Sequence, residues 1–353
     1  MRKIHGESFL FSLLAIISCL FLFNCNEHIH KIYTNQSFED ICSIAYKNKE
    51  AFCIVLVDST QELSRQYCLK LKNKDFVFTS KMIYNIADIN ISSNEWYMKW
   101  LCPLSLPLTC VFSNDGTLID LIPGATKETF LYTRKAIFDM RTTNYHYPNR
   151  FKLPKYAVIP LLNQVLGCKT DLNQGIYIPT ALNNSIDSLR YPYSVYLGIV
   201  GEQMNNDTIK SKTLAGLMME LENPYYLELF KNEFIIAKKL LTPDFKINDG
   251  PNIRVDNEIV SLSDCEVAED NAFVIPIHND GKYPLKILKI FTSCYCLNLV
   301  DHSEEFVISP NDSVMVGFNF RSEELGEVTR DIFITSNSIN KPILYIKILA
   351  NIY

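Results

Sequence analysis

The chain has 353 residues, of which 48% are hydrophobic and 12% aromatic, so it can bury the cores of two or three domains and is not a disordered chain. Its 34 basic and 39 acidic residues give a net charge of -5. No strongly basic block occurs, and this balance argues against nucleic acid as a partner.

The first 25 residues carry a targeting pattern. Two basic residues precede an apolar run at residues 9–23, which is short for a membrane span and suits an export signal. Ser18 before Cys19 resembles the bacterial lipoprotein signal, in which the cysteine is acylated and becomes the mature N-terminus. Cys25 is the alternative acylated residue, because polar residues follow it whereas apolar residues follow Cys19. An uncleaved signal anchor is the other interpretation of the same run.

Between residues 30 and 142 the pattern predicts alternating helices and strands. The clearest feature is a β-hairpin, in which two apolar runs flank Asn114-Asp115-Gly116, because Asp-Gly readily takes positive φ. The predicted elements are a helix at 38–47, a strand at 52–57, a helix at 65–71, a strand at 82–91, a helix at 94–101, strands at 108–112 and 118–122, and a helix at 127–140.

This order, with Pro107 in front of the hairpin and Pro123-Gly124 after it, resembles a thioredoxin-like domain. The resemblance implies that Pro107 is a cis-proline facing a C-x-x-C pair of redox cysteines. Where that pair would begin the second helix, the chain has Ser59 to Ser64 and no cysteine. A disulfide-exchange enzyme needs an activated thiolate and a resolving thiol, so the sequence predicts a domain that has lost this activity. Cys68 lies further along the same helix, where a core cysteine is a better interpretation than a redox thiol.

From residue 144 the composition changes to helical segments separated by Tyr-, Asn- and Pro-rich stretches. We expect these helices to form two antiparallel pairs or a small bundle. A stretch rich in Asn, Asp, Gly and Pro at 242–252 predicts a linker. The predicted helices cover 156–166, run from Pro192 to about 204, from a cap at Asp207 or Thr208 to 221, and from Asn223 and Pro224 to about 241.

The last hundred residues consist of short apolar runs with turn signals between them. Several of these runs alternate apolar and polar residues with a period of two, as strands of a half-buried sheet do. Seven such runs in about 100 residues predict an immunoglobulin-like β-sandwich. The runs lie at 258–262, 272–278, 285–291, 305–309, 313–320, 329–335 and 343–348.

Two motifs in this segment are the most specific of the whole chain, Asn279-Asp280-Gly281 ahead of Pro284-Leu285 and Ser293-Cys294-Tyr295-Cys296. They resemble the N-x-G-x-x-P-L and S-C-x-C motifs of the bacterial domain-of-unknown-function 1573 family, whose members are immunoglobulin-like domains of exported proteins. Tyr295 stands where that family usually has Gly. Lipid-anchored proteins that join such a domain to a thioredoxin-like one resemble envelope proteins of the Bacteroidota, which implies attachment to a bacterial membrane, facing the periplasm or surface.

Cys294 and Cys296 are the one pair of neighbouring residues in the sequence whose side chains indicate redox or metal chemistry. On an extended strand their thiols would face the same side about 6.6 Å apart, so a disulfide between them requires a bend. Such a bond would suit thiol–disulfide exchange. Two thiolates on one face would alternatively bind a soft metal such as Cu(I) or Zn(II), and the third interpretation is a pair of structural thiols at a strand end. Cys265 would join them if its strand is a neighbour.

The motifs of the common hydrolases, kinases and dehydrogenases are absent from the sequence. No pair of histidines lies at metal-ligand spacing with cysteines, and we assign no cofactor. Two of the eleven cysteines belong to the signal, and the rest mostly lie in apolar runs, which predicts buried thiols rather than a disulfide framework.

The sequence therefore predicts a multidomain protein. Its parts are a signal peptide at 1–25, an α/β thioredoxin-like domain at 26–143, an α-helical middle region with a linker at 144–251 and an all-β immunoglobulin-like sandwich at 252–353. The favoured function is a non-catalytic, lipid-anchored cell-envelope protein that binds or assembles with an unidentified envelope protein or peptide. The alternative is a periplasmic thiol–disulfide oxidoreductase, or a thiol or metal carrier, that uses Cys294 and Cys296.

Overall fold

The computed structural model describes residues 31–72, 82–300 and 305–353. The predicted signal peptide, with the acylation candidates Cys19 and Cys25, lies outside the described residues. Among the helices that are described, none is long and apolar enough to cross a membrane. The described residues divide into two compact units.

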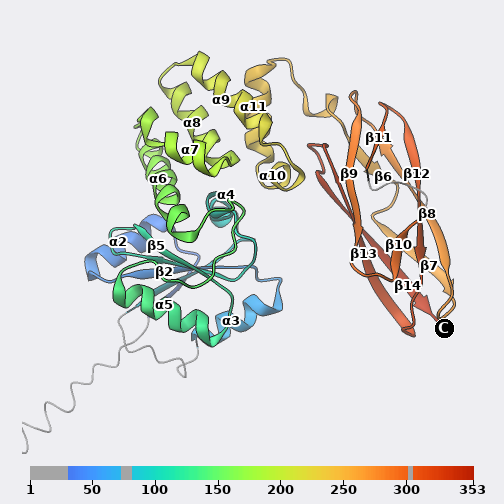
Figure 1. Ribbon diagram of the computed structural model, residues 1–353, viewed down its shortest axis with the longest axis horizontal. Coiled ribbons are helices and arrows are strands. Elements are labelled where there is room, and N and C mark those ends of the chain that lie inside the picture. The colour runs from blue at the N-terminus through green and yellow to red at the C-terminus, as the bar shows by residue number, and fades with distance from the viewer. Residues whose placement is uncertain (1–30, 73–81, 301–304) are drawn as a thin grey trace, which may run out of the picture. The chain divides into compact units, whose positions relative to one another are not determined.

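The first unit contains the described residues up to 97 together with 102–159, and its centre is a five-stranded sheet (Figure 1). Its elements, including a helix α4 that is divided between the units, are β1 (Lys31–Thr34), α2 (Phe38–Asn48), β2 (Phe52–Val57), α3 (Glu62–Lys72), β3 (Ile83–Asp88), α4 (Glu95–Leu101), β4 (Leu108–Phe112), β5 (Leu118–Pro123) and α5 (Lys127–Asp139). The strand order is β1-β3-β2-β4-β5. Strands β1, β3 and β2 are parallel, whereas β4 and β5 are each antiparallel to their neighbours.

Apolar side chains cover both faces of this sheet. On one face, buried residues of β2 and β3 pack against α3 and α5, and the rings of Tyr67 and Phe130 lie 5.0 Å apart. On the other face, Phe38 of α2 packs against Phe52 and Phe112, whose stacked rings are 4.8 Å apart. Every residue of β2 is buried, as expected of a strand that is covered on both sides.

The elements predicted for this unit agree with the structure within a few residues at their ends, with one exception. Residues 31–34 form the edge strand β1, which the sequence pattern did not predict. This strand has four residues and no apolar alternation, and its position is decided by parallel pairing with β3.

The segment that follows α5 is held against β5 by buried polar groups. The Asp120 carboxylate is fully buried, and it accepts a hydrogen bond of 2.6 Å from the Thr143 hydroxyl. The Lys155 ammonium lies 2.6 Å from the same carboxylate, and the Lys155 side chain is only 8% exposed. Burial lowers the pKa of Lys155, although Asp120 acts in the opposite direction. The compact unit therefore continues to residue 159, beyond the change of composition at 144.

The second unit contains residues 98–101 and 160–353, and its first part is helical. Helix α9 packs against α8 and α11. As predicted, Pro192 opens α8 and the Asp207 side chain caps α9. The single helix expected from Pro224 to 241 is broken at Phe230, which has φ -116° and ψ 30°. The helices are α6 (Lys155–Asn173), which begins in the first unit, α7 (Asn183–Leu189), α8 (Pro192–Met204), α9 (Thr208–Glu220), α10 (Pro224–Leu229) and α11 (Lys231–Leu241).

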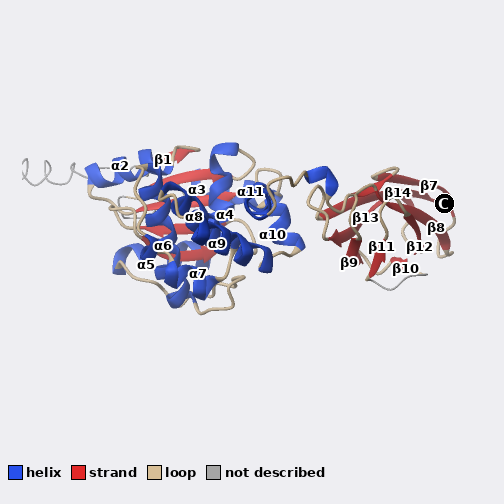
Figure 2. Cartoon of the chain, turned by 90° about the horizontal axis from the view of Figure 1, so that it is seen from above, coloured by secondary structure: helices blue, strands red, loops and turns tan. Residues whose placement is uncertain are grey.

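The C-terminal part of this unit consists of strands (Figure 2). They are β6 (Ile253–Val255), β7 (Ile259–Cys265), β8 (Asn271–Asn279), β9 (Leu285–Thr292), β10 (Leu297–Leu299), β11 (Phe306–Ile308), β12 (Ser313–Phe320), β13 (Gly326–Ser336) and β14 (Ile343–Ile352). One sheet has the order β10-β12-β8-β6, and the other has the order β11-β9-β13-β14-β7. Apolar residues of both sheets share one core, so these strands form a sandwich. The seven predicted strands are present, whereas β6 and β10, which have three residues each, were not predicted.

The Asn279-x-Gly281 motif has a structural role in this sandwich. The Asn279 side chain is fully buried, donates to the Ile308 carbonyl and accepts from the N–H groups of Asn252 and Gly281. A side chain at Gly281 would collide with the backbone of Gly250. Only glycine fits this close approach, so the motif is explained by packing.

Candidate functional site

The two cysteines of Cys294-Tyr295-Cys296 form a disulfide. They lie in the connection that leaves the larger sheet at the end of β9 and enters the smaller sheet at β10. The chain turns at this point instead of remaining extended, which brings the two Cα atoms within 5.2 Å. A disulfide between cysteines two residues apart requires a bend in the chain, and this turn provides it.

Hydrogen bonds from neighbouring segments hold this turn in place. The Ser293 N–H donates to the Asp331 carbonyl, and the Asp331 N–H donates to the Ser293 hydroxyl, both at 2.9 Å. The Thr292 hydroxyl donates to the Cys294 carbonyl at 2.9 Å. On the opposite side, the Arg321 N–H donates to the Cys296 carbonyl at 2.8 Å. The disulfide is therefore fixed to strand β13 and to the segment that follows β12.

The two sulfur atoms have different surroundings. Arg330 of β13 directs its Nε–H at Cys296 Sγ over 3.2 Å. The same guanidinium donates to Glu324 at 2.8 Å and to the Thr329 carbonyl at 2.9 Å, which fixes its orientation. The Arg330 side chain is only 22% exposed, so its charge is partly shielded from water. A cation at this distance stabilises a thiolate.

A surface cavity of about 560 Å³ is lined by residues of this turn and of the strands on either side of it. Cys294 is among its lining residues, whereas Cys296 is not. Phe291 and Leu297 also line this cavity, and so does Tyr295, whose side chain is exposed. A volume of this size accommodates a small molecule or a peptide side chain.

Cys265 does not join this site through a neighbouring strand. It ends β7, and β13 and β14 lie between β7 and β9 in the larger sheet. The side chain is buried. Of the other cysteines, Cys53, Cys102, Cys110 and Cys168 are also buried, which confirms the expectation of buried thiols for most of them.

The segment at the start of α3, where the C-x-x-C motif is missing, is occupied by polar side chains bonded to one another. The Asp58 carboxylate accepts hydrogen bonds from Thr60, Gln61 and Asn90. Partial burial acts to raise the pKa of Asp58, but these hydrogen bonds lower it overall. Ser64 is buried, and its hydroxyl accepts from the Asp58 N–H at 3.2 Å. This arrangement closes the start of the helix without a reactive group.

Pro107 and Cys68 are the other candidates that the sequence placed in this unit. The Leu106–Pro107 peptide bond is cis. Cys68 is half-buried on α3 and packs against the core. Burial raises the pKa of the Cys68 thiol, although Lys72 acts in the opposite direction. The thiol is therefore protonated near neutral pH and is a weak nucleophile.

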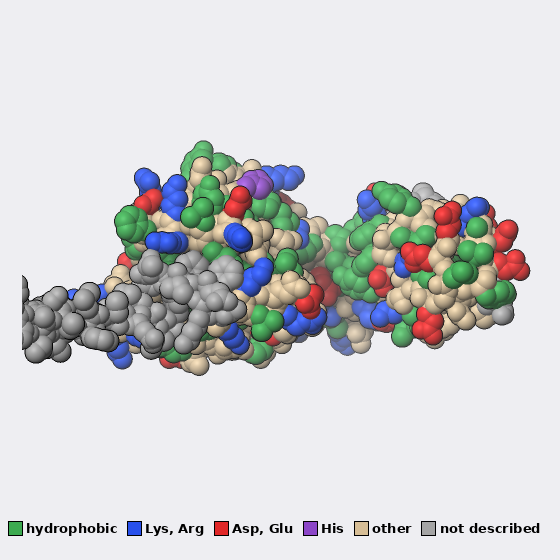
Figure 3. Space-filling view, turned by 90° about the horizontal axis from the view of Figure 1, so that it is seen from below, with side chains coloured by type: hydrophobic (Ala, Val, Ile, Leu, Met, Phe, Trp, Pro, Cys, Tyr) green, Lys and Arg blue, Asp and Glu red, His purple; other side chains and the backbone are tan. Residues whose placement is uncertain are grey.

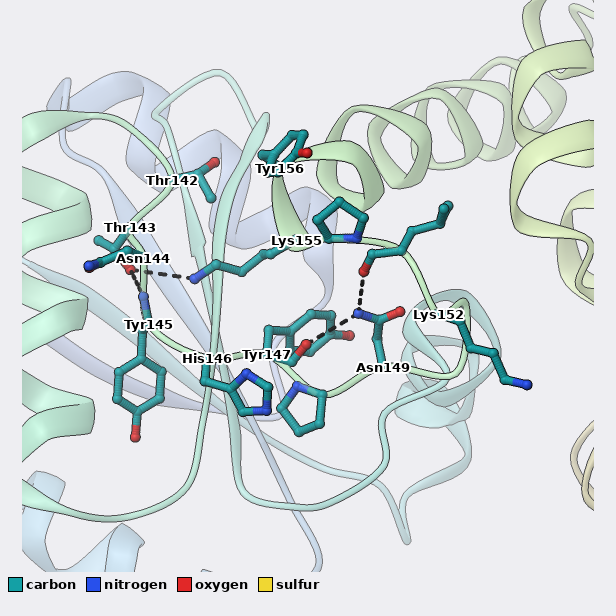
Figure 4. A pocket seen from close by; sticks show the side chains of 13 residues that line it. Thr142, Thr143, Asn144, Tyr145, His146, Tyr147, Asn149, Lys152, Lys155 and Tyr156 are labelled. Carbon is teal, nitrogen blue, oxygen red and sulfur yellow. Dashed lines mark hydrogen bonds between the residues drawn. The ribbon is translucent and has the colours of Figure 1, made fainter.

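Residues of the segment 142–156 line an open surface cavity of about 650 Å³ (Figure 4). Several of its polar groups bond to one another: the Lys155 ammonium reaches Thr143, and the Asn149 amide donates to the carbonyls of Tyr147 and Leu153. Lys152 points away from these groups. The segment therefore holds its own shape, and its lining offers no acid–base or nucleophilic pair.

A row of aromatic rings crosses the outer face of the larger sheet. Ile332 and Ile334 are buried, so by alternation Phe333 between them faces away from the core. Its ring stacks on Phe291 at 4.9 Å and meets the edge of Tyr345 at 5.2 Å. Phe291 is 41% exposed and Tyr345 is 55% exposed. We call these three residues the aromatic row.

Charged side chains of both signs are scattered over the face drawn in Figure 3, with apolar side chains among them. Lys and Arg are not gathered into one basic patch on that face. Within the described ranges, no group of three or more His, Cys, Asp and Glu side chains is arranged to hold a metal ion.

Comparison with known proteins identifies the sandwich. Residues 251–351 match the model of the family described as HYDIN/CFA65/VesB-like, Ig-like domain. The prediction of an immunoglobulin-like domain at the C-terminus is thereby confirmed. Comparison with the curated proteins finds no match.

Three similar solved structures each cover about a third of this chain. A protein of unknown function from Porphyromonas gingivalis W83 is 21% identical, with a TM-score of 0.27, over 31% of this chain and 50% of its own. The ASH/PapD-like domain 7 of human CEP192 is 9% identical, with a TM-score of 0.25, over 31% of this chain and 91% of its own. The secreted serine protease VesC of Vibrio cholerae is 12% identical, with a TM-score of 0.26, over 32% of this chain and 26% of its own. The chain thus spans half of the Porphyromonas protein and about a quarter of the protease.

Proposed function

We propose that this chain is a non-catalytic cell-envelope protein, lipid-anchored at Cys19 or Cys25, that binds or assembles with a partner protein. In this proposal the first unit is a thioredoxin-like domain that has lost its redox motif. The mixed sheet with helices on both faces supports that assignment. The C-terminal sandwich is the second binding module, and the proposal assigns it to the domain-of-unknown-function 1573 family on the strength of its two motifs.

The aromatic row is the observation that carries the binding role. Antiparallel sheets commonly present a polar face to water, and contiguous exposed apolar surface marks interaction sites. Aromatic side chains are enriched in protein interfaces because one ring buries a large area at little cost in side-chain entropy. Phe291, Phe333 and Tyr345 lie side by side on three adjacent strands, so they offer one continuous surface.

The test is photo-crosslinking of the full-length protein in the bacterium that produces it. A benzophenone amino acid at position 345 is expected to give a discrete adduct, and Phe291→Ser is expected to reduce the amount of adduct at least severalfold. Phe138 of α5, which is 86% exposed, provides the matched control position for the same probe. Equal adducts at 345 with and without Phe291→Ser, in a variant whose unfolding transition is unchanged, would contradict binding through the aromatic row.

A second candidate function is thiol–disulfide exchange at Cys294 and Cys296. The observation that favours it is the disulfide itself, which is half-buried at a surface cavity and contacts a guanidinium. The test equilibrates the chain from Asn26 across glutathione redox buffers and locates alkylated thiols by mass spectrometry. A reversible two-electron step between roughly -120 and -270 mV supports this function. Thiols that react only after unfolding count against it.

A further inference from the structure

The disulfide is asymmetric in two independent ways. Cys296 Sγ accepts a hydrogen bond from Arg330, and Cys294 lines the surface cavity that Cys296 does not reach. In thiol–disulfide exchange, one sulfur is attacked and the other leaves as a thiolate. The attacked sulfur must be accessible, and the leaving sulfur departs faster when its thiol has a lower pKa. Both cysteines are half-buried, but the cavity favours Cys294 as the attacked sulfur and the contact with Arg330 favours Cys296 as the leaving sulfur.

We propose that Cys294 is the sulfur attacked by an incoming thiolate, that Cys296 is the leaving sulfur, and that Arg330 stabilises the Cys296 thiolate. This assignment rests on the second candidate function. The incoming thiolate enters the cavity that Phe291, Leu297 and Cys294 line, and attacks Cys294 Sγ there. Arg330 acts as a positioning residue that favours one direction of bond cleavage.

Reduction of the disulfide needs two substrate thiols and no other co-reactant. The incoming thiolate forms a bond to Cys294 Sγ, the bond between Cys294 and Cys296 breaks, and its electron pair remains on Cys296. A second thiolate attacks the incoming sulfur and releases Cys294. The chain has then gained two electrons, the two substrate thiolates have become a disulfide, and the released thiolates take protons from water as the pH dictates.

Other charged groups around the turn modulate this effect. Glu324 pairs with Arg330 at 2.8 Å and therefore weakens the field of the guanidinium at Cys296. Arg321 contacts Cys296 through its backbone, while its side chain lies 3.9 Å from Asp270. Asp331 of β13 is engaged with Ser293 through its backbone groups. Within the described segments, Arg330 is the residue whose charged group contacts a sulfur of the pair.

The experiment measures reduction of the full chain by glutathione, with acid quenching and mass spectrometry to locate the mixed disulfide. Arg330→Gln is expected to slow the reduction roughly three- to tenfold, since a neighbouring opposite charge shifts a pKa by about one unit or more. Glu324→Gln is expected to accelerate it. Arg321→Gln is the matched control, since it removes a guanidinium from the same region without touching a sulfur, and Arg330→Lys is expected to restore part of the rate.

A pH profile separates this role from a structural one. In Cys294→Ser, mass spectrometry follows the reaction of iodoacetamide with Cys296 separately from the other free thiols, and adding Arg330→Gln is expected to move the midpoint of that reaction to higher pH. In Cys296→Ser, the same change is expected to leave the Cys294 profile in place. Mixed disulfide found on Cys296, or equal rates for Arg330→Gln and Arg321→Gln, would overturn the assignment while leaving exchange intact. A disulfide that glutathione reduces only after unfolding would overturn both the exchange function and the assignment.

Discussion

The start of α3, where the C-x-x-C motif is missing, and the connection between β9 and β10, where Cys294 and Cys296 form a disulfide, differ in what surrounds them. At the start of α3 the side chains of Asp58, Thr60 and Asn90 bond to one another, and no cysteine is present. At the β9–β10 connection, a disulfide lines a cavity through Cys294 and contacts a guanidinium through Cys296. A helix N-terminus lowers the pKa of a thiol, but it supports no exchange chemistry where the thiol is missing. The turn in the sandwich is a candidate redox site because Cys294, Cys296 and Arg330 lie together there.

The largest effect is expected from installing the missing pair. Gln61 is exposed just before α3 and Ser64 is buried three residues later, which is the spacing of a C-x-x-C motif. We expect Gln61→Cys with Ser64→Cys, in a Cys68→Ser background, to form a new reducible disulfide, because the helix N-terminus lowers the pKa of the first thiol. Thiol counting before and after reduction measures it, with Gln61→Cys alone as control. If both introduced thiols stay reduced in oxidising buffer, this helix start does not support the motif.

A smaller effect is expected from removing the existing pair. Replacing Cys294 and Cys296 by Ser opens a loop of only three residues, so the chain-entropy estimate of the lost stability is about 1–2 kcal/mol. In calorimetry of the full chain this loss lowers the transition of the sandwich by several degrees. Both tryptophans, Trp96 and Trp100, lie outside the sandwich, so their fluorescence is expected to show an unchanged transition for the other part of the chain. An unmoved sandwich transition would show that the disulfide does not stabilise the sandwich.

The smallest effect is expected in the pH dependence of stability, through Cys42, a half-buried thiol of the first unit. Burial raises the pKa of Cys42 from its ordinary value of 9.0 to about 12, with Glu39 and Asp115 adding to the shift. The folded chain therefore keeps a proton that the unfolded chain loses, and the stability contributed by this group is present below pH 9 and falls as the pH rises toward 12. Denaturant unfolding between pH 8 and 10.5 measures the slope. Cys42→Ser is expected to flatten the slope, and an identical slope in that variant would contradict the assignment to Cys42.

Local patterns predicted most elements because their signals are contained in short stretches. The hairpin turn at Asn114-Asp115-Gly116, the proline at the start of α8 and the Asp207 cap of α9 each act through neighbours in sequence. The sequence did not predict the short strands β1, β6 and β10, because no local signal marks them. Each has three or four residues, too few to show a period, and each exists because a partner strand offers hydrogen bonds.

The candidate site divides in the same way. The sequence by itself determined the identity and spacing of Cys294 and Cys296 and the need for a bend between them. Only the tertiary structure decided that the bend is made, that Cys294 faces a cavity and that Arg330 contacts Cys296. Arg330 is 34 residues from Cys296, and the two meet because β13 pairs with β9 in the larger sheet. The sequence alone determines residue type and local spacing. The electrostatic field at a sulfur atom depends on which strands become neighbours in the folded chain.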